Sequence, residues 1–250
     1  MINRTKLILC TAILVSCVLG ASFLIGCEPT LQAQKNCVVM LGDSIFALTG
    51  QEPAALERLS GSTYRHYYVS GAQLAGGSVI APGDIEDQLN RAINQGSIRT
   101  IIMDGGGNDF LLGVNPDSMV EAELKSAWGR ILTKAANAGV QTIIFQGYYK
   151  TTTATAFQLS INDNIIAWLP AQGAAHGIAL YTYNPNADSW FKSRLPSSYT
   201  LVDGIHPTQA ASQHMAQMLW NLMVKNKVEQ TTSCSSSSSS SSSSTSGGCN

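Results

Sequence analysis

Cys37-Val38-Val39-Met40-Leu41-Gly42-Asp43-Ser44-Ile45 is the stretch from which the fold of this chain is best predicted. Its first five residues form a short, mostly branched apolar run, which is typical of a strand buried in a parallel sheet. Gly42 ends the run, so Ser44 is expected on the loop that leaves the C-terminal end of the strand. Ligands bind at this edge of open α/β sheets, which makes the Ser44 hydroxyl a candidate nucleophile. A helix N-cap is the alternative role for this serine.

Strands and helices alternate along the rest of the chain. Helices are predicted at 47–59, 84–95, 117–138, 156–169 and 208–224, and further strands at 64–69, 100–103, 140–145 and 178–183. Pro170 is expected to end or kink the fourth of these helices. The alternation favours an α/β domain in which helices cover both faces of a parallel sheet. Gly71, Asn108 and the segment 203–206 would then leave C-terminal strand ends beside Ser44.

Length and composition narrow the class of protein. The chain has 250 residues, of which 44% are hydrophobic, and a net charge of −1, which suits one well-buried core. It contains no block of lysine or arginine, so no nucleic-acid partner is expected. No C-x-x-C pair, H-E-x-x-H motif or histidine cluster indicates a metal, and no cofactor is expected. The sequence gives no indication of the oligomeric state.

Residues 1–27 have the features of a targeting signal rather than of a folded domain. A basic start precedes the apolar run 7–25. Leu24-Ile25-Gly26-Cys27 resembles the lipobox of bacterial lipoproteins, in which the cysteine is acylated and becomes the mature N-terminus. The resemblance implies attachment to a membrane, at the outer membrane or cell surface, through a lipid on Cys27. A transmembrane helix and ordinary secretion are the alternatives, and all three export the remainder of the chain.

The tail at residues 228–250 is of low complexity. Residues 235–244 are ten consecutive serines, which cannot bury apolar surface and are expected to form a flexible linker. Cys234 and Cys249 bracket this run and are candidates for a disulfide in an exported protein. Cys37, in the apolar strand, is expected to be an inert buried thiol. The folded domain is therefore predicted within residues 35–227.

Asp203 and His206 form a candidate acid–base pair. Their spacing of three residues places them on one side of a tight turn or helix start, where a carboxylate can hold one imidazole nitrogen. The other nitrogen can then take the proton of the serine, and histidine is the side chain most suited to this near neutral pH. A structural role in the turn is the alternative. The other histidines, His66, His176 and His214, lack a carboxylate at a useful spacing and are expected to be structural.

Acyl transfer also needs donors for the oxyanion that develops at the attacked carbonyl. The backbone N–H groups of Ser44 and Gly71 and the side-chain amide of Asn108 are the candidates. Three glycines, Gly105 to Gly107, precede Asn108 and allow a sharp turn with a close approach of the backbone. Asn108 has an alternative role as a turn residue that stabilises this bend.

Four short motifs together resemble the sequence blocks of the SGNH (GDSL-type) hydrolases. They are, in that family's order, Gly42-Asp43-Ser44, Ser70-Gly71, Gly106-Gly107-Asn108-Asp109 and Asp203-Gly204-Ile205-His206-Pro207. The resemblance implies a three-layer α/β/α sandwich whose five-stranded parallel sheet has the flavodoxin-like order 2-1-3-4-5. It also implies Ser44 as nucleophile, Asp203 and His206 as its partners, Gly71 and Asn108 in the oxyanion hole, and hydrolysis of an ester or thioester without a cofactor.

One block departs from the family pattern. Ala72-Gln73 follows Gly71 where the family more often has an acidic residue and threonine, so the substrate pocket is expected to differ. The chain has no G-x-S-x-G motif, so the α/β-hydrolase fold is not supported.

The sequence therefore predicts a serine esterase acting on a small-molecule or polymeric carboxylic ester. An O-acetyl esterase of polysaccharides is an alternative, favoured slightly by the polyserine run, which is frequent in secreted polysaccharide-degrading enzymes. A surface binding protein that has the fold without the chemistry is a second alternative.

The anchoring hypothesis is tested at Cys27. If this residue is acylated, Cys27→Ser should release the protein from the membrane fraction or leave an unprocessed precursor. Cell fractionation and the mass of the mature protein measure both effects. Identical mass and fractionation of the wild type and the variant would contradict acylation.

Overall fold

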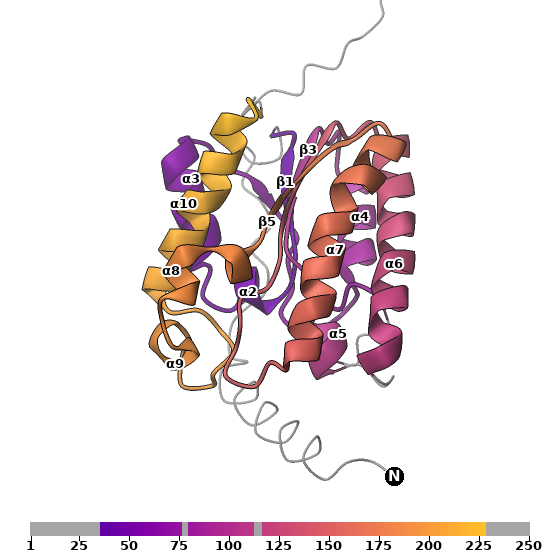
Figure 1. Ribbon diagram of the computed structural model, residues 1–250. Helices are drawn as coiled ribbons and strands as arrows, with labels where there is room; N and C mark the ends of the chain where they lie inside the picture. The colour runs from indigo at the N-terminus through magenta and orange to yellow at the C-terminus, as the bar shows by residue number, and fades with distance from the viewer. Residues whose placement is uncertain (1–35, 77–79, 113–116, 229–250) are drawn as a thin grey trace, which may run out of the picture.

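A five-stranded parallel sheet forms the middle of three layers (Figure 1). The computed structural model describes residues 36–76, 80–112 and 117–228. The strand order is β2-β1-β3-β4-β5, so the predicted α/β fold and sheet order are confirmed. The strands are β1 (Val38–Leu41), β2 (Arg65–His66), β3 (Thr100–Met103), β4 (Thr142–Gln146) and β5 (Ala179–Tyr183). The predicted signal segment and the residues Cys27, Cys234 and Cys249 lie outside the described residues.

Helices cover both faces of the sheet because successive strand residues point to opposite sides. Val39 and Leu41 of β1 pack into one core with α4 (Ile85–Asn94), α6 (Asp117–Asn137) and α7 (Ala156–Ala175). Val38 and Met40 pack into a second core with α2 (Ser44–Ala47), α3 (Gln51–Ser60) and α10 (Gln209–Lys225). Figure 1 shows the two helical layers on either side of the sheet. The apolar run of β1 is therefore continuous because both of its faces are buried.

Three elements differ from the sequence prediction. The helix expected at 47–59 is divided into α2 and α3, because Gly50 adopts a left-handed conformation with φ of 62° and caps α3. The second strand is only two residues long, although the N–H groups of Tyr67 and Val69 still bond to the carbonyl oxygens of Met40 and Gly42. Helix α7 continues through Pro170. That proline lies at an exposed position of the helix.

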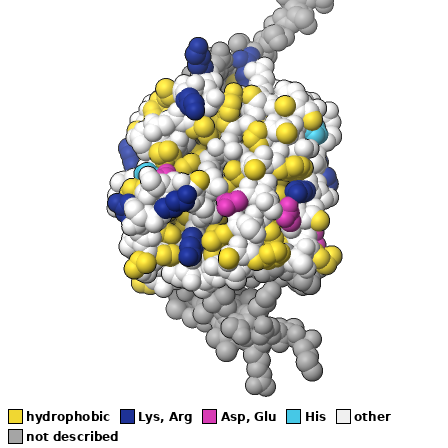
Figure 2. Space-filling model, viewed as in Figure 1, with side chains coloured by type: hydrophobic (Ala, Val, Ile, Leu, Met, Phe, Trp, Pro, Cys, Tyr) yellow, Lys and Arg dark blue, Asp and Glu magenta, His cyan; other side chains and the backbone are white. Residues whose placement is uncertain are grey.

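Shorter elements gather where the strands end. They are α5 (Gly107–Leu111), η2 (Pro185–Ala187), α8 (Ser189–Lys192) and α9 (Pro196–Tyr199). Over the described ranges, no helix has both the length and the apolar character that a membrane span requires. Charged side chains of both signs are scattered over the face in Figure 2 without forming one large patch of either sign.

Cys37 differs from its predicted state. It is disulfide-bonded rather than a free thiol, and all other cysteines of the chain lie outside the described residues. The residue precedes β1 instead of lying within it, and it lines a surface cavity beside Lys227 and Val228. A sulfur at the end of the sheet can be reached by another segment, which a sulfur in the middle of a buried strand cannot.

Candidate active site

Ser44 is the first residue of α2, directly after the turn that leaves β1. Its side chain is largely buried, with 8% exposed. Asp43 is the N-cap of this helix, and its Oδ1 accepts a hydrogen bond of 2.9 Å from the N–H of Ile45. The alternative in which Ser44 serves as an N-cap is therefore wrong. The serine is left free for chemistry at the C-terminal edge of the sheet.

Two buried side chains hold the turn before Ser44. The Gln88 side chain of α4 bonds to both backbone groups of Gly42: its Oε1 accepts from the N–H and its Nε2 donates to the carbonyl, each at 2.8 Å. Asp104, directly after β3, accepts the N–H of Asp43 with its Oδ1 at 2.8 Å. Only glycine fits at position 42, because a Cβ there would lie 1.8 Å from Asp104 Oδ1.

The Asp43 carboxylate is buried, and each of its two oxygens accepts a hydrogen bond. Its Oδ2 accepts a short hydrogen bond from the hydroxyl of Tyr148, which follows β4. Burial raises the pKa of Asp43, and the Ile45 N–H, the Tyr148 hydroxyl and the nearby His206 oppose that shift. The position of His206 close to Asp43 brings the imidazole toward the residue that immediately precedes Ser44.

Asp203 and His206 lie together in the loop between α9 and α10. His206 Nδ1 is 2.6 Å from Asp203 Oδ2, and Asp203 Oδ1 accepts from the N–H groups of Ile205 and His206 at 2.9 and 3.0 Å. Burial would raise the pKa of Asp203, but the His206 side chain and these two N–H groups outweigh it, so the pKa lies below its usual value. A carboxylate held in this way fixes the orientation of the imidazole.

The loop that carries this pair is anchored at several points. The N–H of Leu201 donates to the carbonyl of His206 at 2.7 Å, and an antiparallel bridge joins Thr200 to Pro207. The hydroxyl of Tyr149 donates to the carbonyl of Ile205 at 2.6 Å. The imidazole is therefore positioned by the loop backbone as well as by Asp203.

The outer nitrogen of the imidazole is available for proton transfer. His206 Nε2 is buried and has no hydrogen-bond partner within the described part of the chain, Ser44 included. Catalytic hydrogen bonds are often longer without substrate and tighten in the complex. The structure thus leaves His206 Nε2 without a partner in the described chain, on a residue close enough to Asp43 to lower its pKa.

Asn108 and Gly71 are the two candidate oxyanion residues besides Ser44, and Asn108 lines the same cavity as Ser44. Asn108 belongs to α5 and is buried, and its Nδ2 donates to the carbonyl of Ala72 at 2.9 Å. That bond fixes the amide and uses one of its two hydrogens. Gly71 has a φ of 81°, and a Cβ there would lie 2.6 Å from Ile80. Position 71 therefore requires glycine.

Asp109 links the segment of Gly71 to α5. Its carboxylate oxygens accept from the N–H groups of Leu74 and Ala75 at 2.9 and 2.8 Å. Burial raises the pKa of Asp109 to about 6, although both bonds oppose the shift. The geometry of the candidate oxyanion hole thus depends on a buried carboxyl group that titrates in the weakly acidic range.

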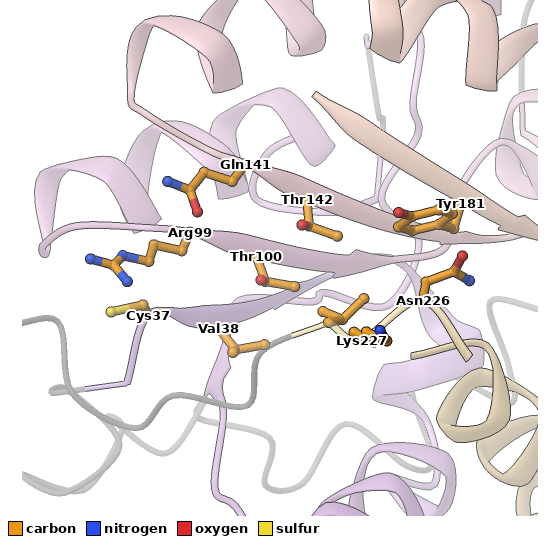
Figure 3. Close-up of a pocket in the computed structure, with 10 residues that line it drawn as sticks. Cys37, Val38, Arg99, Thr100, Gln141, Thr142, Tyr181, Asn226 and Lys227 are labelled. Atoms are coloured by element: carbon orange, nitrogen blue, oxygen red, sulfur yellow. The ribbon is translucent and has the colours of Figure 1, made fainter. Parts of the chain in front are cut away.

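A cavity of about 70 Å³ opens beside Ser44 and Asn108. It is bounded by α5, by the segment after β4 and by the start of α7. A larger cavity of about 190 Å³ lies at the opposite ends of the strands, where Cys37, Arg99, Thr100 and Lys227 line it (Figure 3). None of the predicted site residues lines that larger cavity, so the smaller one marks the candidate active site.

Three residues of the site were not predicted from the sequence. Gln88 occupies a buried position of α4 between Ile85 and Leu89. A polar residue at an apolar position of a helix indicates a buried hydrogen-bond partner, so the sequence pattern could have pointed to it. Asp104 directly follows a strand, which is a second signal. Tyr148 lies on an irregular segment, and no pattern in the sequence indicates that it belongs to the site.

Two of the histidines that lack a carboxylate at a useful spacing in the sequence have a carboxylate partner in the fold. His66 Nε2 lies 2.9 Å from Glu57, and His214 Nε2 lies 2.9 Å from Asp188. Both partners are distant in sequence, so spacing did not show them. Within residues 36–76, 80–112 and 117–228, no group of histidine, cysteine, aspartate or glutamate has the arrangement of a metal site.

Comparison with known proteins identifies the family. A model of the GDSL-like lipase/acylhydrolase family matches residues 40–214, which include every block quoted above. The chain belongs to this family. It is accordingly a carboxylic ester hydrolase with the SGNH fold. A search of curated protein sequences finds no match.

Solved structures share the fold at low sequence identity. A carbohydrate esterase family 3 protein from Talaromyces cellulolyticus is 18% identical, with a TM-score of 0.58 over 77% of this chain and 99% of its own. Est24, a carbohydrate acetylesterase from Sinorhizobium meliloti, is 12% identical, with a TM-score of 0.57 over 77% of this chain and 100% of its own. At these identities the likeness concerns the fold.

The Gln88 bonds to Gly42 predict a kinetic effect at a distance from Ser44. Gln88→Met keeps the volume but leaves two backbone groups unpaired, which should cost about 1 to 3 kcal/mol of stability for each group. Because the nucleophile is then held less firmly, we expect acylation of Ser44 to slow by about tenfold or more per folded molecule. The rate of labelling by a fluorophosphonate measures this.

A matched control for this variant lies on the same helix. Asn94→Met changes an exposed amide of α4 and should leave the labelling rate unchanged. If Gln88→Met labels as fast as the wild type after correction for the folded fraction, Gln88 does not position the nucleophile.

Asp109 predicts a pH dependence of stability. Its pKa is raised to about 6 in the folded state, so the protonated carboxyl is favoured by folding. The contribution of Asp109 to the stability of the fold is therefore fully present below pH 4 and is lost as the pH rises toward and through 6. Asp109→Asn removes this titration. The free energy of unfolding of the variant minus that of the wild type should therefore increase from pH 4 to pH 7, by at most about 3 kcal/mol, because only the wild type loses stability as Asp109 ionises.

Urea denaturation of both proteins at several pH values in this range measures the difference. A difference that is independent of pH would show that Asp109 is not titrating as its burial implies.

Proposed function

We propose that the protein hydrolyses carboxylic esters through an acyl-enzyme formed on Ser44. In this mechanism Ser44 Oγ attacks the ester carbonyl while His206 Nε2 takes the hydroxyl proton. The imidazolium, stabilised by Asp203, then gives that proton to the leaving alcohol. Water, deprotonated by the same imidazole, attacks the acyl group and releases the acid with Ser44 restored.

The observation that carries the proposal is the state of His206. One of its nitrogens is held by Asp203 at 2.6 Å, and the other is buried without a partner beside the Ser44 turn. A purely structural histidine would be expected to use both nitrogens or to expose one to water. An imidazole held by a carboxylate on one side and unpartnered on the other is suited to proton transfer.

The oxyanion that forms during both steps needs fixed donors. We assign this role to the N–H groups of Ser44 and Gly71 and to the free hydrogen of the Asn108 amide. The bond from Asn108 to the Ala72 carbonyl supports the assignment, because it fixes the amide before substrate binds.

For the substrate, we propose an O-acetyl ester on a carbohydrate as the leading candidate within the ester class. The support is the likeness of the fold to a carbohydrate esterase and to a carbohydrate acetylesterase. We also propose that the protein acts outside the cytoplasm, attached through a lipid on Cys27, as the lipobox-like sequence indicates.

Ser44→Ala provides the decisive test of the chemistry. The variant should fold normally and lose ester hydrolysis by at least about a thousandfold. A serine-directed fluorophosphonate should label the wild type only, as detected by the mass of the intact protein and of the labelled peptide. Ser60→Ala, a change of another hydroxyl, is the control and should leave both properties unchanged.

Full labelling of Ser44→Ala would overturn the assignment of the nucleophile. A wild type that hydrolyses neither p-nitrophenyl acetate nor an acetylated glycan, and resists labelling, would instead favour the binding protein without chemistry.

A further inference from the structure

The cavity beside Ser44 has mainly apolar walls. Its aliphatic and aromatic lining comes from α2, from α5, from the chain between β4 and the start of α7, and from the loop before α10. These side chains are Ile45, Phe110, Leu111, Tyr148, Tyr149, Ala154, Leu159 and Ile205. An apolar surface beside a nucleophile is suited to the hydrocarbon part of an ester.

The position of the cavity shows which half of the ester it can hold. Ser44 and Asn108 line the cavity, and so does Ile205, but the next residue, His206, does not. The leaving alcohol must lie beside His206, which supplies its proton. The acyl group extends to the other side of the carbonyl carbon, so the cavity lies on the acyl side.

The volume limits the length of the acyl chain. A cavity of about 150 Å³ in another protein holds one benzene molecule of six carbons. The present cavity, at about 70 Å³, has room for roughly three carbons beyond the carbonyl. This is the length of a butyryl group.

The charge of the lining restricts the chemistry of the acyl group. Asp43 is the one charged residue among the lining residues of the described chain. Its two carboxylate oxygens accept bonds from the Ile45 N–H and the Tyr148 hydroxyl. The cavity therefore offers no free charge to a carboxylated or amino-bearing acyl group, which would lose its hydration without compensation.

We propose that this cavity is the acyl pocket and that it selects short, uncharged acyl groups, from acetyl to butyryl. Leu111 and Leu159 are the specificity-determining residues of this pocket, from α5 and α7 respectively. The inference rests on the proposed function, in which Ser44 becomes acylated.

A series of p-nitrophenyl esters with one leaving group tests the chain length. The values of kcat/KM for acetate, propionate and butyrate should be similar, and that for hexanoate should be at least about tenfold lower than for butyrate, since each methylene that a pocket cannot hold costs about tenfold or more. The p-nitrophenyl hemisuccinate should also react at least about tenfold more slowly than butyrate.

Variants of the wall test the two leucines. Leu111→Ala and Leu159→Ala should each raise the ratio of hexanoate to butyrate activity by about tenfold, because each removes three carbons from the lining. Ala154→Leu fills the pocket and should lower butyrate relative to acetate. Val224→Ala, at an exposed position of α10, is the control and should leave all ratios unchanged. Ratios within one variant do not depend on its folded fraction.

The outcomes separate the two proposals. An active wild type that hydrolyses hexanoate as fast as butyrate overturns the acyl pocket and leaves the acyl-enzyme mechanism intact. Unchanged ratios in all three wall variants also overturn it. Failure of the wild type on the whole ester series, together with resistance of Ser44 to the fluorophosphonate, overturns the proposed function itself.

Discussion

The rest of the site depends on the hydrogen bonds that fix the backbone of Gly42 and Asp43. Gln88 satisfies both polar groups of Gly42, and Asp104 accepts the N–H of Asp43. Through these bonds a helix and a neighbouring strand fix the turn between β1 and α2. Because Asp43 in turn caps α2, the position of Ser44 depends on Gln88 and Asp104, neither of which lines the cavity beside Ser44. Rigid support of this kind is what a nucleophile needs to meet a carbonyl in one geometry.

Buried carboxyl groups beneath this turn adjust its charge. Burial raises the pKa values of Glu52 and Asp104 well above the usual range, and Asp43 and Glu52 each raise that of Asp104 further. These two groups are therefore protonated over a wider pH range than carboxyls in water. The consequence is a lower negative charge close to the place where ester hydrolysis forms an oxyanion. If all of these carboxyl groups were ionised, their negative charges would repel the oxyanion, and their protonation reduces this repulsion.

The alternation of strands and helices could be predicted because apolar runs and glycine stops have a direct physical cause, and the Asp203–His206 contact could be predicted from its spacing. The strand order was predicted from the resemblance of four short motifs to the SGNH hydrolases. The contacts between distant segments could not be predicted. Gln88 looks like an ordinary helix residue until its partner Gly42, 46 positions away, is placed beside it. Spacing showed the Asp203–His206 pair but missed His214 and Asp188, which are 26 positions apart. The division of the first helix at Gly50 was missed because glycine is also tolerated within helices.

Both ends of the described chain lie at the edge of the sheet opposite to Ser44. Cys37, at the start of β1, and Val228, after α10, line the same cavity there. Chain segments before Cys37 and after Val228 therefore join the domain on the side away from the candidate active site. The edge of the sheet that carries Ser44 is therefore clear of both points at which the chain continues beyond the described residues.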